Sequence, residues 1–300
     1  MSGLRAAAAS LALAGLLATA CTPDAAPQAQ RTAAATQGAV PAAGRTPSEQ
    51  PPVKGPRPPL RRASALGTRR PPWLGRRVLP LSDSGYGEVR PTPPVLRRRR
   101  FPTIDLLPPP AGGEFAATVT RVPPAVVARS TWSKGCPIGL DDLRYVTVSF
   151  WGFDRRAHTG ELLVNAAVAD DIVAVFRQLH RQRFPVEQMR VVDAAELDLP
   201  PTGDGNNTTA FVCRPVRGAG NWSQHAYGLA IDVNPFFNPY VKGEVVLPEL
   251  ASHFTDRDRR HPGMHDPDGP AVRAFAESGW EWGGRWSNPR DWMHFSATGG

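Results

Sequence analysis

The alternation of apolar and polar positions predicts two strands and one long helix in the middle of the chain. Residues 144–153, RYVTVSFWGF, alternate and are rich in β-branched and aromatic side chains, which is typical of a strand. Residues 161–165, ELLVN, predict its hairpin partner. Apolar side chains then recur at helical spacing over residues 166–182, where Asn165 can cap the first turn and Pro185 follows the end.

After this helix the chain alternates short apolar runs with turns. Strands are predicted at 189–192, 208–214, 228–233 and 292–297, and a short helix at 272–278. Helices and strands come in mixed order, without a regular βαβ repeat. The predicted fold class is therefore α+β, with a small, mainly antiparallel sheet and flanking helices.

Composition separates a front segment from this folded part. Of the 33 prolines, 19 lie between residues 22 and 110. Residues 1–120 carry 16 basic and 6 acidic side chains, whereas residues 121–300 carry 19 and 21, so the high pI belongs to the front. Such a segment has too few apolar runs to offset its ordering entropy. We expect a disordered linker over residues 21–121 and one domain over residues 122–300.

The first twenty residues have the pattern of a secretory signal, with Arg5, an apolar stretch and then small residues. Cys21 comes next, as in the cleavage box of bacterial lipoproteins. Lipid on Cys21 followed by a basic tether would give two membrane signals. The alternative is plain secretion, with an incidental cysteine and a solvated linker. Both predict an extracytoplasmic protein of the cell envelope without a nucleic-acid partner.

Two cysteines remain in the predicted domain, Cys136 and Cys213. In an oxidising compartment an even pair of cysteines indicates a disulfide. The alternative is two buried thiols. A disulfide would close a long loop and tie the start of the domain to the segment before residue 223.

Two stretches near the end of the chain carry candidate chemistry. Residues 223–232 read SQHAYGLAID, and residues 291–294 read DWMH. They contain His225, Asp232 and His294, which are the ligand types of a zinc site that leaves one position for water. None of the three is a thiolate, which argues against a structural zinc finger.

Two further residues complete a hydrolytic unit. Gly228 permits a bend and a close backbone approach between the first two candidate ligands. Asp291 is a candidate general base, which could take a proton from water and return it to the leaving amine. Glu281 is a second acidic candidate, but it fits a structural role better.

The two-part motif resembles the zinc peptidases that cut peptidoglycan peptides. This is the D-alanyl-D-alanine carboxypeptidase and dipeptidase family (VanY- and VanX-type), which includes L-alanyl-D-glutamate endopeptidases. The resemblance covers roughly residues 130–297 and implies the family's LAS-type fold, one Zn²⁺ and the ligand set above. The matching positions are Ser223, His225, Gly228, Ala230, Asp232, Asp291, Trp292, Met293 and His294.

The resemblance also implies roles for three other side chains. Asp291 would be the catalytic base, Ser223 would contact substrate, and Arg214 would hold substrate or the developing oxyanion. Dipeptidase members carry Glu at the position of Asp291, whereas endopeptidase-like members carry Asp, which leaves the cleavage position open.

The function expected is zinc-dependent hydrolysis of an amide bond in peptidoglycan stem peptides, by a monomer. The alternative is a non-catalytic zinc-containing module that binds peptidoglycan, although such a module would not need Asp291. His158 is a candidate for the substrate cleft, or a hairpin histidine without a catalytic part. His261 and His265 have the spacing of a metal pair, but the Pro-Gly between them breaks the required helix and predicts a solvent loop.

Overall fold

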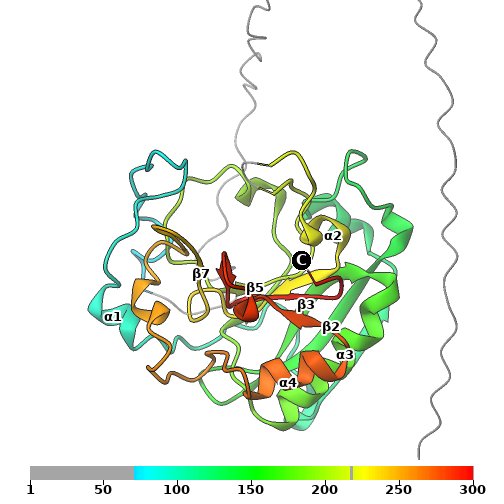
Figure 1. Cartoon of the computed structure of the whole chain (residues 1–300). Helices are drawn as coiled ribbons and strands as arrows, with labels where there is room; N and C mark the ends of the chain where they lie inside the picture. The colour runs from blue at the N-terminus through cyan, green and yellow to red at the C-terminus, as the bar shows by residue number, and fades with distance from the viewer. Residues whose placement is uncertain (1–70, 217–218, 300) are drawn as a thin grey trace, which may run out of the picture. The chain divides into compact units, whose positions relative to one another are not determined.

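A computed structural model describes residues 71–216 and 219–299 (Figure 1). The predicted signal peptide at residues 1–20, the lipidation site Cys21 and the linker as far as residue 70 lie outside the described residues. The described residues belong to one compact unit. Over the described residues, no helix has the length and apolar character needed to cross a membrane.

The first sheet has three antiparallel strands in the order β1-β2-β3. They are β1 (Ala117–Thr120), β2 (Leu143–Trp151) and β3 (Ala157–Asn165). β2 and β3 form the predicted hairpin, paired in register along their full length. Because side chains alternate between the faces of a strand, every second residue of β2 faces the main core. These core residues are Val146, Val148 and Phe150.

The longest helix, α3 (Ala169–Arg181), follows β3 through the 3₁₀ turn η4 (Ala166–Val168). The Asn165 side chain caps this turn, as predicted, by accepting a hydrogen bond from the Ala167 N–H at 3.0 Å. A second helix, α4 (Pro270–Glu277), contacts α3, and Figure 1 shows the two next to each other. The buried side chains of α3 are Ala169, Ile172, Val175, Phe176 and Leu179.

Three smaller sheets complete the described part. Two are antiparallel, with strand orders β6-β11-β9 and β10-β7-β8, and one is the parallel pair β4-β5. Their strands are β4 (Gln188–Met189), β5 (Asn207–Thr208), β6 (Ala230–Asp232), β7 (Tyr240–Lys242), β8 (Val245–Leu247), β9 (Glu281–Trp282), β10 (Arg290–Asp291) and β11 (His294–Ser296). The predicted α+β class with mainly antiparallel pairing is confirmed, with several small sheets in place of one.

The strand predicted at 208–214 is shortened to β5. Beyond it, consecutive backbone groups bond to different partners, the Phe211 N–H to the Leu163 carbonyl at 3.0 Å and the Val212 N–H to the His225 carbonyl at 3.1 Å. Other short helical turns connect the elements. They are η2 (Ala111–Gly113), η3 (Leu140–Asp142), η5 (Ala194–Glu196), η6 (Gln224–Tyr227), η7 (Ser252–Thr255) and η8 (Gly283–Arg285).

The prediction of a disordered linker as far as residue 121 is wrong for residues 71–121, which we call the N-terminal strap. The strap contains α1 (Pro94–Arg97) and contributes β1 as the outer strand of the first sheet. Its apolar side chains form a second core with residues more than 100 positions away. This core contains Leu74, Leu79, Leu96, Phe236, Phe237, Leu250 and Phe254. The proline-rich composition does not predict these contacts, because a proline-rich segment can extend along a folded surface as well as remain free in solvent.

A buried ion pair fixes the strap to the rest of the unit. The side chains of Arg99 and Glu187 are both 0% exposed, and two hydrogen bonds of 2.7 Å join them. Arg99 Nη1 also donates to the Asp204 carbonyl at 2.7 Å, and Asn206 Nδ2 donates to Glu187 at 2.9 Å. A charge buried this deeply is tolerated only when it is paired. Arg99 is therefore part of the fold and not of a solvated tether.

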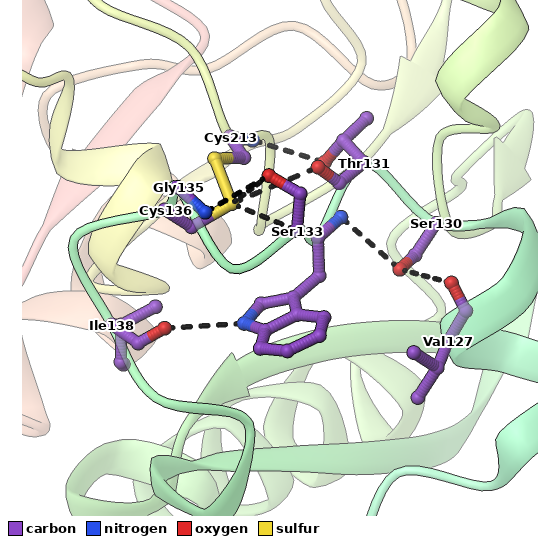
Figure 2. The surroundings of a disulfide bond; sticks show 9 residues. Val127, Ser130, Thr131, Ser133, Gly135, Cys136, Ile138 and Cys213 are labelled. Carbon is purple, nitrogen blue, oxygen red and sulfur yellow. Dashed lines mark hydrogen bonds between the residues drawn. A yellow bond between two sulfur atoms is a disulfide. The ribbon is translucent and has the colours of Figure 1, made fainter.

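Cys136 and Cys213 form the predicted disulfide, with an S–S distance of 2.06 Å and a sequence separation of 77 residues (Figure 2). The Cys213 N–H donates to Thr131 Oγ1 at 2.9 Å. The Trp132 indole N–H donates to the Ile138 carbonyl at 3.1 Å, which closes the loop around Cys136. The segment before residue 223 is thus tied to the loop that follows α2 (Pro124–Arg129).

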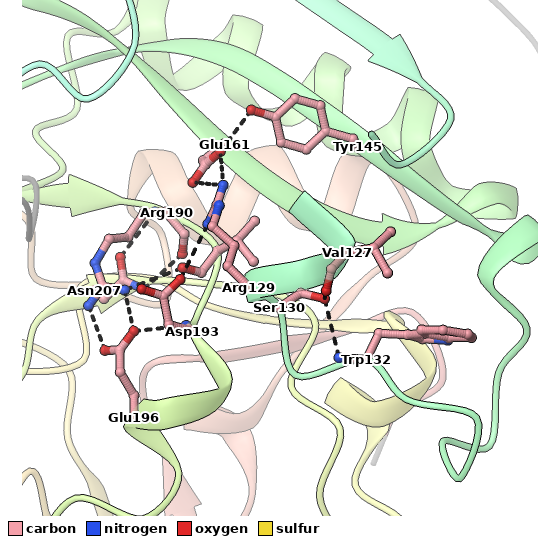
Figure 3. Close-up of polar contacts among 11 residues, drawn as sticks. Val127, Arg129, Ser130, Trp132, Tyr145, Glu161, Arg190, Asp193, Glu196 and Asn207 are labelled. Atoms are coloured by element: carbon pink, nitrogen blue, oxygen red, sulfur yellow. Dashed lines mark hydrogen bonds and ion pairs between the residues drawn. The ribbon is translucent and has the colours of Figure 1, made fainter. Parts of the chain in front are cut away.

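A polar network links α2 to the first sheet (Figure 3). Arg129 Nη2 lies 2.6 Å from both carboxylate oxygens of Glu161, and the Tyr145 hydroxyl donates to Glu161 at 2.7 Å. Burial and the Glu161 charge together raise the pKa of Tyr145. Nearby, Arg190 and Glu196 form a bidentate pair at 2.6 and 2.7 Å. Because these charges neutralise one another, the network acts as a structural support.

Candidate metal centre

Strand pairing brings two of the predicted ligands together. β6 and β11 are antiparallel, and His294 lies directly opposite Asp232 in their register. Asp232 Oδ1 is 3.2 Å from His294 Nδ1 and 3.3 Å from His225 Nε2. One ligand atom from each of the three residues lies within 4.8 Å of the others. The structure thus assembles the three residues that the motif predicts.

His225 is delivered by the turn η6, whose two ends the sequence specifies. At the start, Ser223 Oγ accepts a hydrogen bond from the His225 N–H at 3.3 Å. At the end, Gly228 has φ of +67°, which a residue with a Cβ rarely adopts. A Cβ at Gly228 would also lie 2.5 Å from the Asn165 backbone N. Both the predicted bend and the predicted close approach are present.

A backbone carbonyl orients the His225 ring. His225 Nδ1 lies 2.6 Å from the Ala210 carbonyl oxygen, which can only accept a hydrogen bond. Nδ1 therefore carries a proton, and Nε2 is the ring nitrogen that faces Asp232. Such a partner behind a ligand ring is typical of metal-binding histidines, because it fixes both the tautomer and the ring orientation.

The electrostatics of the three residues favour a cation. Burial raises the pKa of Asp232, but the two imidazoles beside it outweigh burial and hold its pKa well below the ordinary value. Burial lowers the pKa of His294, against the opposing effect of Asp232. An ionised carboxylate beside a neutral imidazole is the protonation state that metal binding requires.

Asp291 lies at the end of β10, opposite Tyr240 on β7. Its Oδ1 atom is buried and has no hydrogen-bond partner among the described residues. Burial and the negative charge of Asp232 raise the pKa of Asp291 well above its ordinary value, while Arg214 opposes the rise. An unpaired buried carboxylate oxygen is costly in a purely structural role.

These observations fit a single metal ion. Two imidazoles and one carboxylate are the donor types of catalytic zinc sites, which have three protein ligands. His225, Asp232 and His294 could hold such an ion. The unpaired Asp291 oxygen can then accept a hydrogen bond from a group bound next to the ion.

Arg214 and Ser223 lie in the segment that leads into η6. Arg214 is exposed, and its positive charge opposes the rise in the pKa of Asp291 and adds to the lowering of the pKa of His294 by burial. The adjacent Cys213 holds this segment in place through the disulfide. The Ser223 N–H donates to the Arg214 carbonyl at 3.3 Å, so the two residues are joined through the backbone.

The structure does not bring His158 to the centre. Its side chain is 2% exposed, and its ring nitrogens contact Asp105 at 2.7 Å and Asp154 at 3.0 Å. It lies at the start of β3, whereas the end of β3 is the part that contacts Gly228. A substrate contact for His158 therefore finds no support, and a structural role as a hairpin histidine fits better.

The other candidate residues, Glu281, His261 and His265, have surroundings of their own. Glu281 is an exposed residue of β9. His265 is buried, not in a solvent loop as expected, and its Nδ1 donates to the Trp292 carbonyl at 2.7 Å. His261 Nδ1 contacts the Pro262 carbonyl instead of pairing with His265.

Three residues of the site were not predicted from the sequence. Ala210 contributes only a backbone carbonyl, which no side-chain pattern reveals. Tyr240 is placed by the register of β7, and burial together with Tyr86 and Asp291 raises its pKa. The Trp286 ring lies 5.5 Å from that of His294. The aromatic stretch GWEWGGRW was the only signal for it.

A buried histidine–aspartate–histidine group that could hold a metal ion, with an unpaired carboxylate oxygen on Asp291, is the type of site found in metal-dependent hydrolases. Residues 217–297 match a family model described as D-alanyl-D-alanine carboxypeptidase. The match supports the family predicted from the motif and a peptidase related to peptidoglycan. It includes the three ligands and Asp291, but Arg214 and both disulfide cysteines lie outside it. No curated protein and no solved structure matches the chain.

Proposed function

We propose that the protein is an exported zinc peptidase that hydrolyses an amide bond in the stem peptides of peptidoglycan. The observation that carries the proposal is the geometry of the centre. Three ligand atoms lie within 4.8 Å of one another, and a buried carboxylate oxygen beside them lacks a partner among the described residues. The family match supports the substrate class.

Side chains of the protein carry out the proton transfers of the proposed hydrolysis. Zinc bound by the three ligands would supply Lewis-acid chemistry, polarising a carbonyl and lowering the pKa of water towards about 7. Asp291 takes a proton on its unpaired Oδ1 and returns it to the leaving amine. Burial suits it to take the proton from water, because a carboxylate with a raised pKa is a stronger base than an ordinary one.

Arg214 supplies a fixed positive charge at the entrance of the site. Its exposure leaves the guanidinium free to meet an anionic group of the substrate or the developing oxyanion. Ser223, next to Arg214 through the backbone, presents its hydroxyl from the start of η6. The disulfide between Cys136 and Cys213 holds the backbone next to Arg214 in place.

The disulfide and the cell-wall family together support an extracytoplasmic location. Lipidation of Cys21, with the basic residues after it drawn to an anionic membrane surface, would keep a monomeric enzyme near its substrate. A carboxypeptidase would release D-alanine from the end of a stem peptide, and an endopeptidase would cut inside it. An aspartate at position 291 can act as the base in a carboxypeptidase or in an endopeptidase, so this residue does not distinguish the two activities.

Product analysis by mass spectrometry tests the proposal. The full chain, loaded with zinc, is incubated with purified peptidoglycan and with soluble stem peptides. Free D-alanine identifies a carboxypeptidase, and a new internal amine identifies an endopeptidase. Asp291→Asn should abolish product while zinc stays bound, because the ligands are untouched. Asp141→Asn, at a carboxylate that is 90% exposed, serves as the matched control and should retain activity.

Two outcomes would contradict the proposal. Full activity of Asp291→Asn with zinc bound would exclude its role as the base. Absence of any product, with zinc bound and peptidoglycan retained by the protein, would identify a non-catalytic module that binds peptidoglycan.

A further inference from the structure

A pocket of about 400 Å³ lies beside the turn between β2 and β3. We call it the arginine pocket. Its lining contains no ligand of the metal centre, and neither Asp291 nor Arg214. The lining residues are Arg100, Trp151, Gly152, Phe153, Arg155, Arg183, Pro185 and Pro262. Three guanidinium groups thus surround a wall made of aromatic and proline side chains.

No acceptor of the protein neutralises these three arginines. Within residues 71–216 and 219–299, none of the three guanidinium groups has an ion pair or a hydrogen bond to a carboxylate; Arg183 alone has a partner, the Trp151 ring at 4.9 Å. Two carboxylates of the neighbouring segments already have other partners. Asp154 contacts His158, and Glu187 is paired with Arg99. The pocket therefore keeps a net positive charge that an anionic ligand could meet.

The backbone holds two of the arginines in an unfavourable conformation. Arg155 has φ of +62° and Arg183 has φ of +53°, and Asn234 is the one other non-glycine residue with positive φ in the described part. Glycine or asparagine is usual at such positions because a Cβ is disfavoured there. Because both residues are held in left-handed turns, the backbone fixes where the two arginine side chains leave the chain.

The third arginine is fixed by the buried ion pair of the strap. Arg100 follows Arg99, whose guanidinium is locked to Glu187 by two hydrogen bonds of 2.7 Å. The backbone at Arg100 is thus held in place before any ligand arrives. This explains part of the arginine run at residues 97–100, for which the peptidase chemistry has no use.

We propose that the arginine pocket binds a phosphate ester carried on a sugar or polyol. A phosphate group has enough acceptor oxygens to engage several guanidinium groups, which match its geometry in bidentate fashion. The half-buried Trp151 and Phe153 and the two prolines offer an apolar wall for the carbon skeleton. The ligand can be a free sugar phosphate or a polymer of phosphodiester-linked polyols, because both present the same group.

The pocket is expected to work independently of the metal. Pro185 in its wall accepts a hydrogen bond from Asn234 Nδ2 at 2.8 Å, so the pocket wall contacts the segment that follows β6. Binding there would retain the enzyme on an anionic polymer without using any group of the metal centre. The proposal therefore does not depend on the proposed peptidase activity.

NMR titration of the full chain with glucose 6-phosphate tests the proposal, with the Gly152 amide and the Trp151 indole as reporters. We expect saturable shifts, equal in zinc-loaded and chelated protein, and none with glucose. Arg100→Gln, Arg155→Gln and Arg183→Gln should each weaken binding at least tenfold. Arg156→Gln is the matched control, since Arg156 is exposed on the same turn but does not line the pocket.

Arg155→Gly separates binding from structure. It should weaken binding as Arg155→Gln does, yet leave the melting temperature unchanged or higher, because glycine suits the left-handed conformation. Poly(glycerol phosphate) binding more tightly than glycerol phosphate would identify the polymer as the source, and equal affinity would identify the free ester. Three results would overturn the proposal: no saturable shift, an equal loss in Arg156→Gln, or tighter binding of an oligodeoxynucleotide.

Discussion

Replacement of Gly228 by alanine tests how the backbone positions the metal centre. Gly228 has φ of +67°, and an added Cβ would lie 2.5 Å from the Asn165 backbone N and 2.9 Å from the Val164 carbonyl carbon. The left-handed conformation costs an alanine roughly 1–2 kcal/mol. Forcing a methyl group into a packed site costs about 1–3 kcal/mol more, because backbone atoms have to move. Together these changes predict a loss of about 2–5 kcal/mol in the free energy of unfolding.

The same substitution should weaken metal binding. The Gly228 carbonyl accepts a hydrogen bond from the Asn165 N–H at 2.9 Å, and the Gly228 N–H donates to the His225 carbonyl at 3.1 Å. A shift of Gly228 away from Asn165 therefore moves the turn that carries His225. Disturbing the support of a ligand lowers metal affinity by about 10–100-fold, and we expect a decrease of that order.

Urea unfolding of the chelated protein and a zinc-competition titration measure the two effects. Gly279→Ala is the matched control, because Gly279 has φ of +80° but nothing within 4 Å of an added Cβ. Gly279→Ala should lose only the roughly 1–2 kcal/mol that the left-handed conformation costs an alanine, and it should keep the zinc affinity of the wild type. If Gly228→Ala were no more destabilising than Gly279→Ala, or bound zinc like the wild type, the close approach to Asn165 would not be what positions His225.

Three other predictions concern the rest of the fold. Replacing Cys136 and Cys213 by serine should cost about 4 kcal/mol of stability for a 77-residue separation, measured by urea unfolding; an unchanged midpoint would contradict the loop-closure argument. Burial lowers the pKa of His265 to about 3 from 6.5, so the unfolded chain binds more protons between these values and stability falls as pH is lowered through them. Stability measured from pH 7 to 4 should fall less in His265→Gln than in the wild type, and equal slopes would refute this. Arg99→Met should cost about 3–5 kcal/mol because it leaves Glu187 charged and buried, and adding Glu187→Leu should recover much of the loss; a double variant as unstable as the single one would exclude that cause.

Features encoded over short stretches could be predicted from the sequence. The β2–β3 hairpin follows from alternation, and α3 follows from helical spacing with a cap at Asn165. The ligands were also predictable, because few residue types bind zinc and their spacing matches a known motif. Each of these inferences needs only neighbouring residues or a fixed chemical pattern.

Features that depend on distant partners could not be predicted in this way. Leu74 and Leu96 are buried only because Phe236 and its neighbours provide a surface for them. The average composition of the front segment is dominated by proline and does not reveal its three buried leucines, Leu74, Leu79 and Leu96. The His225–Ala210 contact depends on a backbone carbonyl, so no choice of side chain signals it.

The strap has a consequence for how the protein can be shortened. β1 lies at the outer edge of the first sheet and pairs with β2, so a chain that begins at residue 122 would expose the hydrogen-bonding edge of β2. An open edge of this kind recruits other strands and promotes aggregation. The same cut would leave the Glu187 carboxylate buried without its cation. Proteolytic trimming to residue 121 would therefore destabilise the fold and favour aggregation, although every residue of the metal centre would survive.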